Sequence, residues 1–248
     1  VPLTSGTFRP DVEALRAAIT PRTRLLLLNS PHNPTGSVFT RDELLAIAQV
    51  VVEHDLWVIS DEVYEHLVYT DHEHIAFATL PGMFERTITM GSAGKTLSMT
   101  GWKVGWATGP ADLIGAVRVP RQHLSFVSGG PFQWAVVEGL ALPDEHWASF
   151  RDGLQSQRDQ WCDGLNALGI PTVVPEGTYF ATSDIRALGY EDGWAFCRDL
   201  PHRAGVVAIP QQVFHDDAEA GRPFVRWAFC KRPEVLDEAL TRMQRAFG

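Results

Sequence analysis

Short, unbroken apolar runs recur through the first half of the chain and alternate with segments of mixed polarity. Four of these runs predict strands, at residues 24–29, 56–60, 86–90 and 104–108. Runs of this length without a polar interruption are typical of strands in a parallel sheet that is covered on both faces. The first half of the chain is therefore expected to form a sheet with helices packed against it.

Amphipathic helices are predicted between and after these strands. Apolar side chains at helical spacing predict helices at 10–19, 44–52, 111–119 and 133–142. Thr40 and Glu43 form the pattern of a capping box ahead of the second of these helices. Pro120 predicts a break or a kink after the third. Alternation of strand and helix indicates an α/β layered domain.

The pattern changes near Pro143, which we interpret as a domain boundary. Beyond it, a long helix is predicted at 147–168, and shorter elements follow. These are strands at 172–174, 178–182, 206–209 and 224–229, and helices at 192–200 and 234–247. This mixture predicts a small α+β domain. We therefore expect two domains, a large one at 1–143 and a small one at 144–248, both of ordinary domain size.

Composition narrows the class of protein. The 248 residues are 45% hydrophobic, which is ordinary for a globular protein, and the formal net charge is −9. An acidic chain argues against nucleic acid or an anionic membrane as the main partner. No apolar run reaches membrane-spanning length, and no secretory signal is visible at Val1. The chain is therefore expected to be cytoplasmic.

Three cysteines, Cys162, Cys197 and Cys230, lie far apart and form no CxxC pair. An odd number of scattered cysteines favours reduced thiols in the cytosol, where the side chains act as small buried apolar groups. Nine histidines include a His-Glu-His run at 72–74 but no HExxH pattern. We therefore expect no metal site.

The segment from Gly91 to Trp106 carries the most informative chemistry. It places Lys95 after a turn of small residues and Lys103 between two tryptophans. Such a turn lets backbone and hydroxyl groups approach a ligand, and a lysine there can form an imine with an aldehyde or neutralise a phosphate. A phosphorylated aldehyde cofactor would use both properties. The rival interpretations are a surface lysine and a nucleotide-binding P-loop, which needs glycine where the chain has Thr89.

Reactive side chains lie just beyond three successive predicted strands. Asn33 follows the first strand, Asp61 and Tyr64 follow the second, and Ser92 and Lys95 follow the third. In open α/β sheets, ligands bind at the carboxyl ends of the strands. Each residue also has a structural interpretation, since Asn33 could shape a turn, Asp61 could cap backbone groups and Tyr64 could be packing. Their recurrence at successive strand ends favours one shared site.

Five segments together resemble the class I/II aminotransferases. They are 30–36, 61–64, 92–95, 101–106 and 225–227, and they occur in the family's order and with its spacings. These relatives are fold-type I enzymes that depend on pyridoxal phosphate (PLP). Ser-Pro-His-Asn-Pro-Thr-Gly, Asp-Glu-Val-Tyr-Glu-His and Thr-Gly-Trp-Lys-Val-Gly-Trp are most similar to the N-succinyldiaminopimelate and kynurenine aminotransferase group. The resemblance implies an α/β fold of type I, with part of the large-domain sheet, its flanking helices and a C-terminal α+β small domain.

The resemblance also implies roles for the residues at the strand ends. Lys95 would hold PLP as a Schiff base and carry the proton at the substrate Cα. Asp61 would pair with the pyridine nitrogen and keep the ring protonated, so that the ring can accept electron density. Tyr64 and Asn33 would hydrogen-bond the ring hydroxyl.

Ser92 and Lys103 would bind the cofactor phosphate, the first through its hydroxyl and the second through its charge. Many relatives carry arginine at the position of Lys103, and lysine keeps the charge but loses bidentate geometry. Arg226 would bind the substrate α-carboxylate, and Asn33 is implied in substrate binding as well. An arginine on a half-buried strand is costly without an anion, and its fork suits a carboxylate. The other interpretation of Arg226 is a structural ion pair.

The implied reaction is PLP-dependent transfer of an amino group between an amino acid and a 2-oxo acid, as in N-succinyldiaminopimelate-type or kynurenine-type aminotransferases. Two alternatives stay open, a carbon–sulfur β-lyase with the same residues and the effector domain of a transcription regulator. The rings of Trp102, Trp106, Phe132 and Tyr179 either admit bulky substrates or belong to the core. By family resemblance the protein is expected to be a homodimer.

The resemblance begins part-way into the family's pattern, because relatives carry a further portion before the position that matches Val1. That portion supplies a phosphate-binding turn and several strands of the sheet. A sheet without those neighbours presents an open apolar edge. The 248-residue chain alone is therefore expected to bind PLP weakly or not at all and to be poorly soluble.

Overall fold

The computed structural model describes residues 1–248 and separates into two compact units. The first unit contains Val1, Arg9–Pro31 and Val38–Ala148, and the second contains Pro2–Phe8, His32–Ser37 and Ser149–Gly248. The chain passes from one unit to the other within helix α6 (Asp144–Ala167). The segment His32–Ser37 belongs to the second unit, although its neighbours in the sequence belong to the first. The division into domains at 1–143 and 144–248 stays a prediction.

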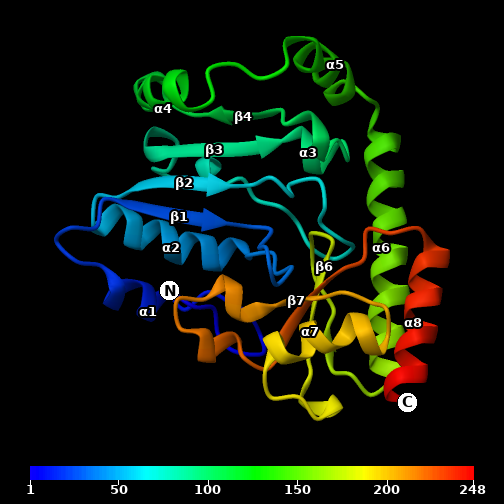
Figure 1. Ribbon diagram of the computed structural model, residues 1–248. Helices are drawn as coiled ribbons and strands as arrows, with labels where there is room; N and C mark the ends of the chain where they lie inside the picture. The colour runs from blue at the N-terminus through cyan, green and yellow to red at the C-terminus, as the bar shows by residue number, and fades with distance from the viewer. The chain divides into compact units, whose positions relative to one another are not determined.

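A four-stranded sheet lies in the first unit (Figure 1). Its strands, in spatial order, are β1 (Leu25–Asn29), β2 (Trp57–Asp61), β3 (Thr87–Ser92) and β4 (Gly105–Thr108). β1, β2 and β3 are parallel, and β4 pairs with β3 in the antiparallel direction. The four strands predicted for this region are confirmed. Because β1, β2 and β3 are parallel, their carboxyl ends lie at the same edge of the sheet.

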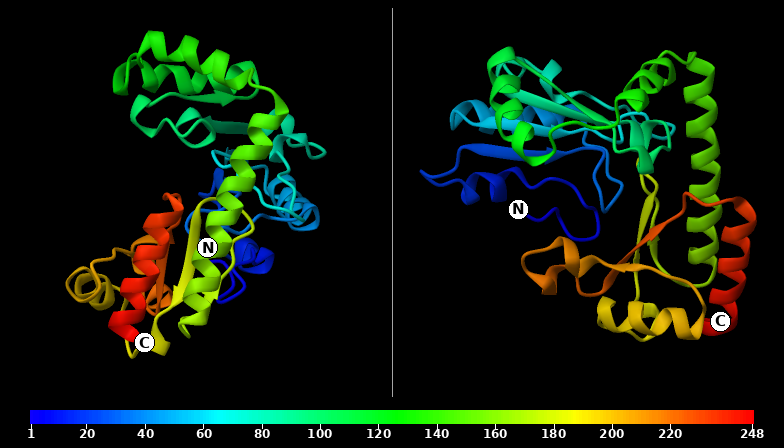
Figure 2. Two further views of the ribbon diagram at one scale, coloured as in Figure 1. Left: turned by 90° about the vertical axis from the view of Figure 1, so that its right-hand side faces the viewer. Right: turned by 45° about the horizontal axis from the view of Figure 1, so that its top comes forward.

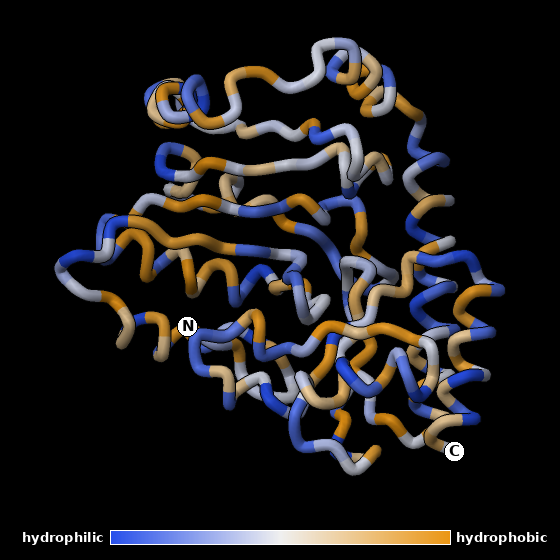
Figure 3. The backbone as a smooth tube through the Cα atoms, viewed as in Figure 1, coloured by the Kyte–Doolittle hydropathy of each residue, from blue (hydrophilic) through white to orange (hydrophobic).

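Strand β1 is less buried than its sequence predicts. The side chains of Leu25 and Leu27 are 44% and 64% exposed, whereas Leu28 is buried. Figure 3 shows the apolar colouring along this strand. The apolar run alone favours a strand covered on both faces, but one face of this edge strand is open to solvent, which agrees with the open apolar edge expected of the sheet without further neighbours.

The helices of the first unit are α1 (Val12–Ala18), α2 (Arg41–Glu53), α3 (Ala93–Thr96), α4 (Ala111–Leu124) and α5 (Gly130–Leu140). The capping box is confirmed, since Glu43 N–H donates to Thr40 Oγ1 at 3.3 Å and Thr40 N–H donates to Glu43 Oε2 at 2.7 Å. Of the break or kink predicted at Pro120, the break is absent, because α4 continues through this residue, and the kink stays a prediction. Proline removes one helical donor, but Ser125 N–H still bonds the Arg121 carbonyl at 3.0 Å, so the last turn is kept.

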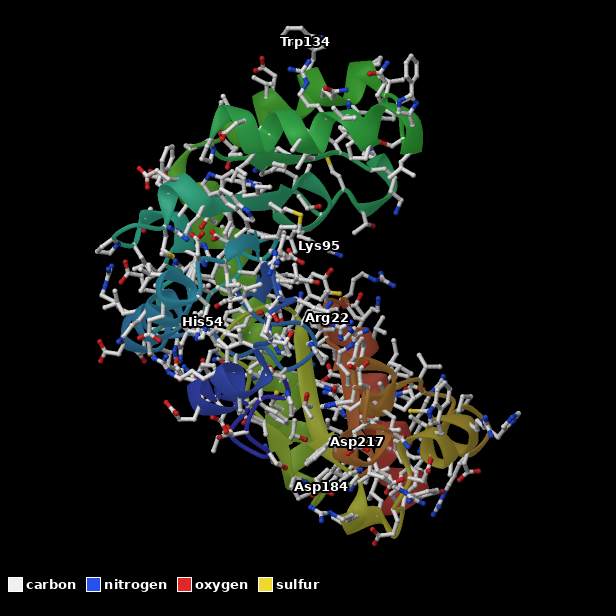
Figure 4. The ribbon with its side chains drawn as sticks, turned by 90° about the vertical axis from the view of Figure 1, so that its left-hand side faces the viewer. Arg22, His54, Lys95, Trp134, Asp184 and Asp217 are labelled. Carbon is white, nitrogen blue, oxygen red and sulfur yellow. The ribbon has the colours of Figure 1, made fainter.

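A small apolar cluster packs beside α3 in the first unit. Ala93, Val104 and Val136 are its buried members, and Leu97, Trp102 and Trp106 pack against them. Trp134, two positions before Val136 on α5, projects outward instead (Figure 4). The packed face of α5 is therefore the one that covers the segment carrying Lys95.

The second unit contains a small antiparallel sheet and three helices. Its strands, in spatial order, are β5 (Thr172–Val173), β6 (Phe180–Asp184), β8 (Phe224–Ala228) and β7 (Ile209–Pro210). The helices are the part of α6 that follows Ala148, α7 (Gly193–Arg203) and α8 (Pro233–Phe247). All neighbouring strands are antiparallel, so the α+β character predicted for this region is confirmed.

Helices α6 and α8 run side by side in the second unit (Figures 1 and 2). Gln160 Nε2 on α6 donates to Asp237 Oδ1 on α8 at 2.6 Å. Trp161 on α6 meets Trp227 of β8 edge to face, with ring centroids 5.5 Å apart, and both side chains are buried. The helix pair therefore covers the face of the small sheet that carries Trp227.

Six short 3₁₀ helices complete the described chain. They are η1 (Phe77–Thr79), η2 (Phe84–Arg86), η3 (Thr100–Trp102), η4 (Arg186–Leu188), η5 (Gln211–Phe214) and η6 (Ala218–Gly221). None of the helices combines the length and the apolar character that crossing a membrane requires. The three cysteines form no disulfide, and no group of three or more histidine, cysteine or acidic side chains is arranged to hold a metal ion.

Candidate active site

Asp61 is the last residue of β2, and β2 lies between β1 and β3. Its register partners are Asn29 on β1 and Met90 on β3, so Asp61 stands at the carboxyl edge of the parallel strands. Asn29 Nδ2 donates to the Asp61 carbonyl at 2.9 Å, and Val63 N–H donates to Asp61 Oδ1 at 3.3 Å. Burial raises the pKa of the Asp61 carboxyl, while the Val63 N–H and the charge of Lys95 act in the opposite direction.

Lys95 lies on α3, one turn beyond the end of β3. Its Nζ is 5.7 Å from the centroid of the Tyr64 ring, and the Tyr64 side chain is buried. The charge of Lys95 also favours the ionised form of Asp61, so the amine is close enough to act on that carboxylate. Figure 4 labels Lys95 in the first unit. An amine, a phenol and a carboxylate therefore gather at one edge of the sheet.

Ser92 and Lys103 flank the start of α3. Ser92 is the N-cap residue of α3, and its Oγ accepts from Gly94 N–H at 3.2 Å. Ala93 N–H donates to the Val104 carbonyl at 3.1 Å, which brings the backbone of Lys103 beside that of Ser92. Lys103 is exposed and adopts a left-handed conformation with φ 57° and ψ 39°. The hydroxyl and the charge therefore lie on neighbouring segments.

Gly91 is required by protein packing. A Cβ atom at this position would lie 2.2 Å from Trp106 Nε1 and 2.3 Å from Trp106 Cε2. The small residue thus accommodates the indole ring, whereas the sequence had suggested close approach of a ligand. Trp102 stacks on Phe132 with centroids 4.8 Å apart. Trp102 and Trp106 both pack on the apolar cluster beside α3, which supports a core role for these two rings.

Asn33 and Arg226 belong to the second unit and contact each other. Arg226 Nη1 donates to Asn33 Oδ1 at 2.7 Å, although 193 positions separate the two residues in the sequence. Arg226 lies on β8, opposite Thr182 of β6 and Ile209 of β7. The predicted site residues therefore form two groups. Asp61, Tyr64, Ser92, Lys95 and Lys103 lie in the first unit, and Asn33 and Arg226 lie in the second.

Sequence reasoning missed the aromatic side chains that contact Arg226. Arg226 Cζ lies 4.0 Å above the centroid of the Phe180 ring and 4.8 Å from that of Phe214. A cation over the face of an aromatic ring is attracted by the negative charge density of that face. Phe180 lies 46 positions and Phe214 lies 12 positions before Arg226, and each is on another element, so the spacing of a helix or a strand could not have indicated the contact.

Sequence reasoning also missed a buried carboxylate next to Asp61. Glu62 accepts from Ser60 Oγ at 2.7 Å, from Phe77 N–H at 3.0 Å and from His74 Nε2 at 2.9 Å. These bonds attach the segment around His74 to the end of β2. His74 is part of the His-Glu-His run, and its structural partner here is a carboxylate. The alternation of side chains along the strand separates Glu62 from Asp61, and the repulsion between the two raises the Asp61 pKa further.

Known proteins show which family shares this arrangement. The model of the aminotransferase class I and II family matches residues 1–243. A Mycobacterium tuberculosis protein named probable N-succinyldiaminopimelate aminotransferase DapC is 48% identical over 244 residues, which cover 95% of this chain and 62% of that protein. A kynurenine–oxoglutarate transaminase of Dictyostelium discoideum is 41% identical over 257 residues, which cover 95% of this chain and 59% of that protein.

A solved structure agrees with these sequence matches. The N-succinyldiaminopimelate aminotransferase from Mycobacterium tuberculosis superposes with a TM-score of 0.95 at 49% sequence identity, covering 99% of this chain and 64% of that one. The fold is accordingly that of the type I PLP-dependent aminotransferases. The chain belongs to the aminotransferase class I and II family. It spans about three fifths of the length of the relatives it matches.

Proposed function

We propose that this chain contributes to PLP-dependent transfer of an amino group between an amino acid and a 2-oxo acid. The observation that carries the proposal is the gathering of Lys95, Asp61 and Tyr64 at the carboxyl edge of three parallel strands. Family membership supports the reaction class, because relatives at 48% and 41% identity are named aminotransferases. The structure by itself supports only the positions of the side chains.

The donor set at the sheet edge fits PLP. An amine suits the aldehyde, a carboxylate suits the pyridine nitrogen, and a hydroxyl with a nearby cation suits the phosphate. Lys95, Asp61, Ser92 and Lys103 would take these positions, and the Tyr64 phenol and Asn33 would bond the ring hydroxyl. The Asp61 carboxyl pKa is raised by burial, so a cationic ring nitrogen would supply the charge that stabilises its ionised form.

Bound PLP would supply an electron sink for the pair of electrons that the substrate Cα–H bond releases. Lys95 Nζ would take the proton from the substrate Cα and would deliver it to the carbon on the cofactor side of the transferred nitrogen. It could do both because the amine is held next to the reacting atoms. Asp61 would keep the pyridine nitrogen protonated. Arg226 would hold the α-carboxylate through its fork, with Asn33 fixing the guanidinium. Water would supply the oxygen of the new oxo group, and the second 2-oxo acid would release one water when it takes up the amino group, so the two halves balance.

Two relatives suggest the substrate class. We infer an N-succinyldiaminopimelate-type or kynurenine-type substrate pair from their names. The family resemblance also favours a homodimer, and the three unpaired cysteines favour a reducing compartment such as the cytoplasm. A carbon–sulfur β-lyase would use the same lysine and carboxylate. Release of pyruvate and ammonia from a cysteine conjugate without any oxo acid would favour that alternative.

The chain offers a sharp test, because Lys95, Lys103 and Lys231 are its only lysines. The chain is mixed with excess PLP, treated with borohydride and digested, and peptide mass spectrometry locates the cofactor. Because the chain alone is expected to bind PLP weakly, labelling should need a large excess of PLP. Any label that forms is expected on Lys95, with loss of the label in Lys95→Ala without transfer to the other lysines, and reduced labelling in Asp61→Ala. Lys231→Ala is the matched control and should label like the parent chain.

Labelling that is spread evenly over the three lysines, or that is found on Lys231 alone, would overturn the assignment of Lys95. The reaction itself is tested with ¹⁵N-labelled glutamate and a second 2-oxo acid. Appearance of ¹⁵N in the new amino acid, abolished by Lys95→Ala, supports amino transfer. Release of the glutamate ¹⁵N as free ammonia, with no ¹⁵N in the new amino acid, would contradict amino transfer.

A further inference from the structure

Two aromatic rings approach the Arg226 guanidinium from the two strands that neighbour β8. Phe180 is the first residue of β6, which pairs with one edge of β8. Phe214 ends η5, which directly follows β7 on the other edge of β8. Arg226 Cζ lies 4.0 Å from the centroid of the Phe180 ring and 4.8 Å from that of Phe214. The rings are therefore brought to the guanidinium by separate elements of the second unit.

The two rings differ in their exposure. Phe180 is 7% exposed, so it is part of the packed interior beneath the arginine. Phe214 is 40% exposed, so its ring contacts the guanidinium and also faces solvent. A ring with one part open to solvent beside a cationic group can contact whatever that group binds. This position distinguishes Phe214 from Phe180.

The segment that carries Phe214 is anchored at its start. Gln211 Nε2 donates to Thr182 Oγ1 at 2.8 Å, and the Gln211 side chain is buried. Thr182 is the register partner of Arg226, so this bond attaches η5 to the β6–β8 pair next to the arginine. Gln212 Oε1 accepts from Trp194 N–H at 3.2 Å and provides a second attachment. The backbone that carries the Phe214 side chain is therefore held at two points.

An arginine side chain has considerable rotamer freedom, and holding it in one orientation costs free energy. The bond from Nη1 to Asn33 Oδ1 fixes one end of the fork. A ring stacked on the guanidinium restricts rotation of its plane, because the cation is attracted to the ring face. Together the amide and the rings define both the position and the plane of the group.

We propose that Phe214 is a positioning residue that sets the plane of the Arg226 guanidinium for the α-carboxylate of the substrate. The inference rests on the proposed function, in which Arg226 binds that carboxylate. Amino acid and 2-oxo acid carry the same α-carboxylate, so Phe214 acts equally on both. Its exposed ring edge also gives the bound carboxylate an apolar neighbour, which excludes water from one side of the ion pair.

The test uses four variants of the chain. Phe214→Leu keeps apolar bulk and removes the ring, whereas Phe214→Tyr keeps the ring. Val213→Ala is the matched control, because Val213 is the exposed neighbour of Phe214 on η5. Arg226→Lys identifies the Arg226 signal in the ¹⁵N spectrum of arginine-labelled chain. Pyruvate is the probe, since it presents a carboxylate and an oxo group with only a methyl group as side chain.

We expect pyruvate to shift the Arg226 signal in a saturable way. Phe214→Leu should move that signal even without pyruvate, because the ring current is lost, and should raise the half-saturating concentration about two- to fivefold. Phe214→Tyr and Val213→Ala should leave both quantities close to those of the parent chain.

The proposal is overturned if pyruvate does not titrate the Arg226 signal, if Phe214→Leu leaves the half-saturating concentration unchanged, or if Val213→Ala has the same effect as Phe214→Leu. The proposed aminotransferase function is judged separately by borohydride labelling of Lys95. Saturable binding of pyruvate that depends on Phe214, together with label found on Lys231 alone or spread evenly over the three lysines, would keep the positioning role and remove the assignment of Lys95 on which the proposed reaction rests.

Discussion

Acidification should destabilise the fold through His32, which precedes Asn33 in the second unit. Its Nδ1 is hydrogen-bonded to Thr35 Oγ1 at 2.8 Å, and its backbone N–H and carbonyl bond Ser37 and Gly36. Burial and, to a smaller extent, the nearby charge of His215 together lower the pKa of the His32 imidazole from 6.5 to about 4. The folded chain therefore favours the neutral ring.

The sign and size of the effect follow from linkage. The unfolded chain binds a proton at His32 near pH 6.5, whereas the folded chain resists it until about pH 4. The contribution of His32 to stability is therefore fully present above pH 6.5 and is lost as the pH falls towards 4. A shift of this size corresponds to about 3 kcal/mol in total and to about 2 kcal/mol between pH 7.5 and pH 5.

The assay is urea unfolding, followed by tryptophan fluorescence, at pH 7.5 and pH 5. The comparison variant is His32→Asn, because asparagine cannot be protonated in this range and its amide can reach Thr35. The free energy of unfolding of the parent chain should fall by about 2 kcal/mol more than that of His32→Asn between the two pH values. His54→Asn is the control, since His54 is an exposed residue at the end of α2 (Figure 4) and its replacement should leave the pH dependence unchanged.

Equal losses of stability in the parent chain and in His32→Asn would refute the reasoning, because the buried imidazole would then bind its proton as easily in the folded as in the unfolded state. A functional consequence is also expected. His32 adjoins Asn33, whose Oδ1 fixes the Arg226 guanidinium. Protonation of His32 in the folded chain, near pH 4, should therefore also weaken carboxylate binding by Arg226.

Two further predictions concern packing and reactivity. Gly36→Ala should destabilise the chain by about 2–4 kcal/mol in urea unfolding, since Gly36 has φ 78° and an added Cβ would lie 2.3 Å from Pro175 Cβ. Gly6→Ala is the control, because Gly6 has φ 82° but no atom within 4 Å of the added Cβ, and it should cost only about 1 kcal/mol. Equal costs of the two substitutions would show that packing against Pro175 is unimportant. Burial raises the thiol pKa of Cys162 and Cys197 to about 12, so both should resist a thiol reagent at neutral pH in the folded chain and react in urea, and rapid labelling of Cys162 in the folded chain would contradict its burial.

The sequence predicted the local elements well because their signals are local. The capping box at Thr40 and Glu43 forms as its spacing requires, and the apolar runs become strands close to the predicted positions. The helix does not break at Pro120, since one lost donor is a small fraction of the bonds that hold α4, and the kink given as the other possibility stays a prediction. The apolar run of β1 alone favours cover on both faces, yet one face is open, because a strand's own sequence does not state which strands and helices will lie beside it.

The sheet-edge group was also accessible from sequence. Asp61 and Lys95 each follow an apolar run, and parallel strands bring their carboxyl ends to one edge. Glu62 was overlooked because its partners Ser60, His74 and Phe77 lie on segments whose approach depends on how the chain returns to the end of β2. The same limit applies to Gly91, whose need for a small side chain comes from the Trp106 ring.

The sequence by itself determined the strands, the helices, the reactive side chains at the strand ends and the family to which the chain belongs. These depend on side-chain periods, capping and short motifs, which act over a few residues. The tertiary structure alone decided that Asn33 bonds Arg226 and that Phe180 and Phe214 stack on the same guanidinium. Such contacts join residues far apart in the chain, and they arise only when burial of the whole apolar pattern fixes the register of β6, β7 and β8.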